Sequence, residues 1–275
     1  MFTVDFFNEL FVLFRAFAIL NSGFSGLLFV YGTFFCFICG DPLLLSGYQL
    51  YFSGLVCVSM PERGLHAELK EWLRKPGDLV EGTVWGYRAD IIRGDLLIEI
   101  QTGNFPQIRA KLAKLLNGYR VRLVYPVPER RWVIREVDGK QHRRVSPHIG
   151  RVEEVFNELI YCPTLPLAPN FSLEVLLVYA EEAQAVRWRG KRRTRYTVTE
   201  RHLVKVVNTI VFEKPVDYLH LLPKMNGAFT TRQLSKAAGL RITLARRMVY
   251  CLAKMGLIEE VGTVARAKLY HLKAS

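Results

Sequence analysis

A short hairpin-like segment constrains the fold of this chain more than any other feature of its sequence. Residues 88–104 read RADIIRGDLLIEIQTGN, and Gly94-Asp95 places glycine at the first position of a two-residue turn. With that turn, Asp90 lies opposite Glu99, with the Cβ atoms about 5 Å apart. Facing carboxylates repel each other unless their charge is compensated. Because apolar residues surround them, a hard divalent cation such as Mg²⁺ is the natural compensation.

Amphipathic patterns around this hairpin predict a compact α/β core of the order α-β-β-β-α-β. A helix is expected over 63–74, where apolar residues recur at helical spacing until Lys75-Pro76-Gly77. The remaining elements are strands over 79–85, 87–93 and 96–102, a helix over 105–117, and a strand over 119–125 that stops at Pro126.

This arrangement resembles the PD-(D/E)XK, or restriction-endonuclease-like, nuclease superfamily. Mapped onto this chain, Asp90 is the first acid of the motif, Glu99 is the second, and Glu68 or Glu71 is the acid from the first helix. The resemblance implies phosphodiester hydrolysis that depends on Mg²⁺ or Mn²⁺. Asp90 and Glu99 would bind the metal, and Glu68 would be an auxiliary ligand.

The chain departs from the family pattern at Gln101, which stands where lysine is usual. A neutral amide can orient the attacking water but cannot stabilise negative charge as lysine does. Lys111 or Lys114 on the following helix could supply that charge. Two other interpretations stay open: an inactivated nuclease fold, or surface acids that pair with Arg88 and Lys111.

The middle region, residues 127–215, is expected to be a basic α+β region. A hairpin is predicted around Asp138-Gly139 and a helix over 152–161, followed by a proline-marked crossover. Residues 171–187 and those from Tyr196 onward are predicted to be strands, and a helix capped by Thr199 is expected over 200–211.

A basic turn between these strands forms the densest positive cluster, flanked by aromatic residues. Positive charges neutralise phosphates and aromatic rings stack on exposed bases, which predicts contact with nucleic acid; a solvated hairpin tip is the alternative. The basic residues are Arg187, Arg189, Lys191, Arg192, Arg193 and Arg195.

Residues 216–275 resemble a winged helix-turn-helix, as found in many bacterial regulators. The elements expected are a first helix over 216–222, a short helix capped by Thr230 or Thr231, a second helix over 243–255, and two strands around a loop at Gly262. The resemblance implies DNA contacts from the second helix and the wing. The candidate residues are Arg241, Thr243, Arg246, Arg247, Arg266 and Lys268.

The first 59 residues differ in composition from the rest. They hold one basic and three acidic residues of the 38 and 25 in the chain, so residues 60–275 carry +15 of formal charge. Residues 16–40 contain no charge and are long enough to cross a bilayer. The segment is an upstream extension from a wrongly assigned start, a membrane anchor or a buried helical hairpin.

We therefore expect an apolar leader (1–59), a nuclease-like core (60–126), a basic middle region (127–215) and a winged helix (216–275). The predicted function is DNA binding with metal-dependent cleavage, in the cytoplasm or tethered to a membrane with cytoplasmic C-terminal domains. The alternative is a regulator that binds DNA through its winged helix and has a degenerate nuclease fold. Homodimer formation is left open.

Overall fold

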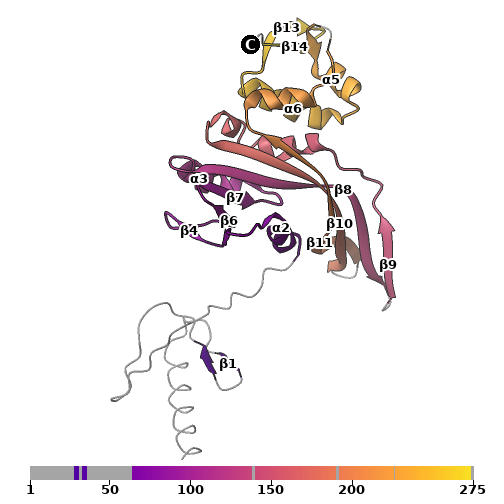
Figure 1. Cartoon of the computed structure of the whole chain (residues 1–275). Helices are drawn as coiled ribbons and strands as arrows, with labels where there is room; N and C mark the ends of the chain where they lie inside the picture. The colour runs from indigo at the N-terminus through magenta and orange to yellow at the C-terminus, as the bar shows by residue number, and fades with distance from the viewer. Residues whose placement is uncertain are drawn as a thin grey trace, which may run out of the picture. The chain divides into compact units, whose positions relative to one another are not determined.

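A computed structural model gives the fold of the chain, which is shown in Figure 1. It divides into two units, residues 1–58 and 59–275, and each is described by itself. The structure describes residues 28–30, 33–35, 64–137, 140–189, 192–225 and 227–273.

In the first unit, β1 (Leu28–Val30) pairs antiparallel with β2 (Thr33–Phe35). Most of the uncharged run 16–40, and with it the proposed membrane anchor, lies outside the described residues. In the described part of the chain, no helix is long and apolar enough to cross a membrane.

The second unit is a mixed α/β domain built on a central mixed sheet with the strand order β11-β10-β8-β7-β6-β3. The middle strand β8 runs parallel to both β7 and β10, whereas the remaining pairs, including β9 on β8, are antiparallel. The strands are β3 (Leu79–Val80), β6 (Ile91–Arg93), β7 (Leu96–Ile100), β8 (Arg120–Val137), β9 (Lys140–Val145), β10 (Phe171–Arg189) and β11 (Arg192–Phe212). A separate small ladder joins β4 (Thr83–Val84) to β5 (Tyr87–Arg88).

The helices α2 (Leu65–Leu73) and α3 (Phe105–Leu115) contribute to two different hydrophobic clusters, as expected for helices on opposite faces of one sheet. Leu69 of α2 packs with Ile98 and Ile100, whose side chains alternate along β7 with that of Leu97. Leu97 belongs to the cluster that includes the buried residues of α3. Both clusters also contain residues of β10, so the sheet and its core continue beyond residue 126.

The prediction that a strand stops at Pro126 is wrong, because β8 continues through Pro126 and Pro128 to Val137. Backbone groups of residues two apart point to the same edge of a strand. The carbonyl of Val124 faces β7, because it accepts a hydrogen bond from the Gln101 amide. Pro126 and Pro128, two and four positions later, therefore lack an N–H on the edge that faces β7. Beyond Ile100, β7 has ended, so no ladder bond is lost there.

The prediction of a helix over 200–211 is also wrong, because these residues belong to strand β11. The segment is rich in β-branched residues, which favour the extended backbone, and it pairs with β10 along its length. Thr199, expected as a helix cap, instead donates its hydroxyl hydrogen bond to the carbonyl of Ala183.

Short helical segments lie before β10, between residues 146 and 170, and after β11, between residues 213 and 222. The predicted helix over 152–161 is confirmed as a 3₁₀ turn that leads into one α-helical turn, whereas the helix expected over 216–222 is 3₁₀. The segments are η1 (Val152–Val155), α4 (Phe156–Leu159), η2 (Leu165–Leu167) and η3 (Pro215–Leu221).

The C-terminal part contains α5 (Thr231–Ala238), α6 (Ile242–Lys254) and a three-stranded sheet of order β12-β14-β13. Thr230 caps α5 through the amide of Gln233, and Gly239 ends it at a φ of 64°. The strands are β12 (Phe229–Thr230), β13 (Ile258–Val264) and β14 (Ala267–Leu272). The loop expected at Gly262 is wrong: Gly262 lies within β13 at a register shift, and the turn is Ala265-Arg266, both at positive φ.

Candidate functional site

The hairpin predicted from Gly94-Asp95 is confirmed, and it forms the wall of a polar cleft. Ile91 pairs with Ile98, Ile92 with Leu97, and Arg93 with Leu96. Asp90 directly precedes β6 and Glu99 lies in β7, each one position beyond the Ile91–Ile98 pair that ends the ladder. The cleft has a volume of about 290 Å³ and is lined by His66, Asp90, Glu99, Ile100, Gln101, Gln107, Ile108 and Lys111.

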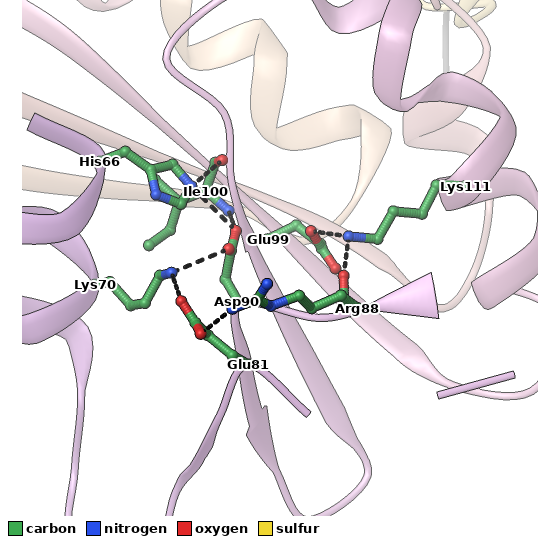
Figure 2. A network of polar contacts seen from close by, with 8 residues as sticks. All are labelled: His66, Lys70, Glu81, Arg88, Asp90, Glu99, Ile100 and Lys111. Atoms are coloured by element: carbon green, nitrogen blue, oxygen red, sulfur yellow. Dashed lines mark hydrogen bonds and ion pairs between the residues drawn. The ribbon is translucent and has the colours of Figure 1, made fainter. Parts of the chain in front are cut away.

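The Asp90 carboxylate is held by groups from α2 and β7 (Figure 2). Its Oδ2 accepts a hydrogen bond of 2.8 Å from the backbone amide of Ile100 and lies 3.4 Å from Nε2 of His66. Its Oδ1 lies 3.6 Å from Nζ of Lys70. Nε2 of His66 also lies 3.1 Å from the carbonyl oxygen of Ile100, and since a carbonyl only accepts, this nitrogen carries the proton.

The Glu99 carboxylate is almost completely buried, with 2% of the residue exposed. Its Oε2 accepts a hydrogen bond of 2.6 Å from Nζ of Lys111, which reaches the cleft from α3 and also donates to the carbonyl of Arg88. Its Oε1 has no hydrogen-bond partner among the described residues. A buried carboxylate oxygen without a partner is costly, so this atom marks a place where a cation or water would bind favourably.

The two carboxylates have pKa values that are shifted in opposite directions. Burial raises the pKa of Glu99 to about 7, against the hydrogen bond and charge of Lys111, which lower it. Burial also acts to raise the pKa of Asp90, but the hydrogen bonds from His66 and the Ile100 amide, with the charge of Lys70, outweigh burial and bring it below its ordinary value. Neighbouring carboxylates with separated pKa values are typical of functional sites.

A second set of charges supports Asp90 from behind. Nζ of the buried Lys70 lies 2.8 Å from Oε1 of Glu81, and Glu81 also accepts from Arg88. Hydrogen bonds from Lys70 and Arg88 hold the pKa of Glu81 below its ordinary value. Lys70 therefore bridges two carboxylates and fixes the position of Asp90 relative to α2.

Two other predicted site residues, Gln101 and Glu68, make contacts that differ from the predicted roles. Gln101 lines the cleft, but its amide nitrogen donates to the backbone carbonyls of Gly103 and Asn104. Glu68 is not in the cleft: it accepts a hydrogen bond from the backbone amide of Leu203 and lies 2.9 Å from Nδ1 of His202, both in β11. The expectation that Glu68 acts as an auxiliary metal ligand is therefore not supported by its position.

Sequence reasoning missed His66 and Lys70 as residues of the site. They lie four positions apart on α2, so their side chains project from the same face of the helix towards Asp90. The signal was present in the sequence as an i, i+4 pair of basic residues on a helix beside the hairpin. The acids Glu68 and Glu71 of the same helix point elsewhere, Glu68 to β11 and Glu71 to Arg74.

Two carboxylates from adjacent strands fit a magnesium ion, which keeps several waters and needs few protein ligands. Asp90 and Glu99 would hold it, and the buried Oε1 of Glu99 is the atom that lacks another partner. Among the described residues, no cluster of three or more His, Cys, Asp or Glu side chains has the geometry of a metal site.

The predicted nucleic-acid-binding residues of the basic turn lie at the ends of β10 and β11. The ladder runs to Arg187↔Arg195, Trp188↔Arg193 and Arg189↔Arg192, which confirms the hairpin as backbone. Lys191 and the side chains of this turn lie outside the described residues.

On α6 and the β13–β14 hairpin, the predicted residues divide into exposed and engaged side chains. Arg241, Thr243, Arg246 and Arg266 are exposed. In contrast, Nη1 of Arg247 donates a hydrogen bond of 2.6 Å to Oδ1 of Asn157 in α4, and Lys268 lies 2.8 Å from Glu260. The assignment of Arg247 to DNA contact is therefore not supported, because its guanidinium faces the α/β domain.

The fold and the site together define a mixed α/β protein with a buried glutamate and a partly buried aspartate in a cleft beside its central sheet. The chain belongs to the family described as Domain of unknown function (DUF8091), which matches residues 63–213 and so includes the whole cleft. A relative described as an uncharacterized protein of Treponema pallidum (strain Nichols) is 26% identical over 216 residues, covering 76% of this chain and 85% of the relative. No solved structure matches the chain.

Proposed function

We propose that this protein is a DNA-binding nuclease that hydrolyses phosphodiester bonds with the help of Mg²⁺ or Mn²⁺. The observation that carries the proposal is the buried Oε1 of Glu99, which lacks a partner and lies beside Asp90 in an open polar cleft. When bound there, the metal would activate water and neutralise charge on the phosphate. The resemblance of the hairpin to the PD-(D/E)XK motif agrees with this chemistry.

The side chains of the cleft would divide the remaining tasks. Asp90, held in its ionised form by His66 and the Ile100 amide, would supply a permanent negative charge. Glu99 would be the second ligand, and the charge of the metal would offset the burial that raises the pKa of this carboxyl to about 7 without metal. Lys111 would take the part of the lysine that Gln101 replaces, because its ammonium group is bonded to Glu99, the second acid of the motif.

The C-terminal part supports DNA as the substrate. We propose that residues 216–275 form a winged helix-turn-helix, with α5 and α6 as the helix pair and the β13–β14 hairpin as the wing. The exposed Arg241 and Arg246 would lie towards the phosphates or bases, and Arg266 would project from the turn of the wing. A positive excess in this part of the chain favours a polyanionic partner.

A cleavage assay on the full chain tests the proposal. Linear, supercoiled and branched DNA are incubated with Mg²⁺ or Mn²⁺, and the wild type is compared with Glu99→Gln and with Glu71→Gln, which removes an exposed acid of α2. We expect metal-dependent cleavage that Glu99→Gln abolishes and Glu71→Gln retains. Tight binding of these DNAs without cleavage by the wild type would contradict the nuclease.

One observation favours a second candidate, a DNA-binding regulator with a degenerate site. Lys111 already compensates one oxygen of Glu99, and the amide of Gln101 is tied to backbone carbonyls. In that case Lys111 and Glu99 would form a structural ion pair that only stabilises the fold. The same assay separates the two, because the regulator would bind DNA equally well with the metal chelated and would leave it intact.

A further inference from the structure

The long strands β8, β10 and β11 continue as a sheet beyond the layer that α3 covers, where the short strand β9 joins them, as Figure 1 shows. Along β8, Leu123 lies beside Glu99, and Arg130 follows seven residues later, at a distance of about 23 Å for an extended strand. We call this outer part of the sheet, formed by residues 130–137 and 140–145 with β10 and β11 beside them, the arm.

One face of the arm carries two aromatic rings flanked by cations. Trp132 and Tyr179 lie edge to face, with their centroids 5.7 Å apart. Nζ of Lys205 lies 4.7 Å from the centre of the Tyr179 ring, and the guanidinium of Arg143 lies 4.8 Å from that of Trp132. Arg130 lies 5.7 Å from the Tyr179 ring. These five residues form a row across β11, β10, β8 and β9, which we call the cation–aromatic strip.

The strip and Glu99 of the acidic cleft lie on the same face of the sheet. Glu99 is in register with Leu123 of β8, and Leu123 with Leu173 of β10. Side chains along β10 alternate, so Leu173 and Tyr179, six positions apart, point to the same face. The strip and Glu99 therefore share one face of the sheet, on which α3 and α4 also pack.

The cations of the strip differ from those on the opposite face of the arm. On that face, Arg131 and Arg201 both contact the buried Glu182, and Arg135 donates to Gln184. On the strip, Nη2 of Arg143 lies 2.7 Å from Oε1 of Glu181, whereas Lys205 and Arg130 lie against the Tyr179 ring. Among the described residues, the three cations of the strip therefore meet one carboxylate, Glu181, while the opposite face has its own cation–ring pair, in which Arg135 lies 3.6 Å from the centre of the Tyr196 ring.

We propose that the cation–aromatic strip binds the unpaired bases of single-stranded DNA. A base can stack on Trp132 or Tyr179 when the flexible side chain of Arg143 or Lys205 swings away, and the displaced cation can then meet a phosphate. Stacking on aromatic rings is available to every base but not to bases inside a duplex, so the strip selects single strands without selecting sequence. This inference deepens the proposed nuclease, because it makes DNA with a single-stranded segment the substrate of the cleft.

Binding without chemistry provides the test. The full chain is titrated into a fluorescein-labelled oligothymidylate of about 20 nucleotides, and into a duplex of equal length, with EDTA present so that no cleavage occurs. Anisotropy gives the affinity of the wild type, of the double variant Trp132→Leu/Tyr179→Leu and of Trp132→Phe/Tyr179→Phe, which keeps both rings. Trp72→Leu, which removes an exposed tryptophan of α2, is the matched control.

We expect the leucine variant to bind the oligothymidylate roughly tenfold more weakly than the wild type, whereas the phenylalanine variant and Trp72→Leu stay within about twofold. Duplex affinity is expected to be the same in all four proteins. The inference is overturned if the leucine variant binds single strands as tightly as the wild type.

A second measurement covers the case in which the leucine variant does not fold. The emission of Trp132, obtained as the difference between the wild type and Trp132→Phe, is expected to be quenched by the oligothymidylate, and an unchanged emission would overturn the inference. If the leucine variant loses single-strand binding but the wild type cleaves no DNA, the inference about the strip holds and the proposed nuclease activity is wrong. If cleavage is lost in Glu99→Gln but unchanged in the leucine variant, the nuclease activity holds and the inference about the strip is wrong.

Discussion

Nζ of Lys111 lies 2.6 Å from Oε2 of Glu99, although the two residues belong to different elements, α3 and β7. The lysine thus comes from the helix that follows the second acid, while the position two residues after that acid holds the neutral Gln101. The positive charge expected of the motif is present in space but comes from another part of the sequence.

Lys111→Met tests the part assigned to this charge. If Lys111 stabilises the transition state, we expect the rate of cleavage to fall roughly 10²- to 10³-fold, which is typical for loss of one electrostatic donor. Lys114→Met, which removes an exposed lysine one turn further along α3, is expected to leave the rate within twofold. Equal rates for the two variants would show that Lys111 only neutralises Glu99.

The raised pKa of Glu99 predicts a pH dependence of stability for the metal-free protein. In the folded state the carboxyl group has a pKa of about 7, and in the unfolded chain it has an ordinary value near 4.5. The folded protein therefore binds this proton more tightly. The stability that the proton provides is complete below about pH 4.5 and is lost as the pH rises through about 7.

Glu99→Gln removes that proton-binding group while keeping its shape. The free energy of unfolding of the wild type, relative to the variant, is expected to fall by up to about 3 kcal/mol between pH 4.5 and pH 8. Urea titrations in EDTA at several pH values measure this difference. A difference that stays constant over the range would contradict the raised pKa.

Glu68 is expected to support the edge of the sheet rather than the chemistry. It accepts a hydrogen bond from the amide of Leu203 and pairs with His202, whose pKa its hydrogen bond raises. Glu68→Gln should reduce the free energy of unfolding by about 1 kcal/mol and leave DNA cleavage intact. Glu71→Gln, at an exposed position of the same helix, is the control and should change stability little.

The His202 pair also gives the pH dependence of the Glu68 effect. The folded-state pKa of His202 lies above its ordinary value of 6.5, so the stability gained from the pair is full below pH 6.5 and is lost as the pH rises through the folded-state pKa. The destabilisation by Glu68→Gln should accordingly be larger at pH 5.5 than at pH 9. An equal effect at the two pH values would show that the backbone hydrogen bond alone matters.

Arg246 and Arg247 are neighbours in α6 with different surroundings. Arg246 is exposed, so Arg246→Ala should weaken DNA binding and reduce the slope of its salt dependence by about one. Arg247 is bonded to Asn157, so Arg247→Ala should lower the melting temperature and leave the salt slope unchanged. Binding titrations at a series of salt concentrations, with thermal melts, measure both effects. A salt slope that falls equally in the two variants would return Arg247 to the DNA-binding surface.

The hairpin, and with it the meeting of Asp90 and Glu99, could be predicted from the sequence because it depends on local information. The turn residues and the alternation of apolar side chains fix the register, and the register fixes which residues face each other. The short helices over 65–73 and 105–115 were predicted for the same reason.

Other features depend on contacts between distant parts of the chain. Residues 200–211 contain a pattern that fits a helix, but their pairing with β10 decides for a strand. Pro126 was interpreted as the end of a strand because the sequence does not show which edge of β8 lacks a partner. Likewise, the sequence does not show that Glu68 points to β11 or that His66 points to Asp90.

At one point β8 carries one residue more than its partner: Val178 pairs with Pro128 and Tyr179 with Arg130, which leaves Glu129 without an opposite residue. An extra residue of this kind bends a strand while leaving the pairing on either side intact. The same short stretch contains the two prolines. Insertions, deletions or a change of bend at 126–130 could therefore alter the reach and direction of the arm in descendants of this protein while the geometry of the cleft stays unchanged.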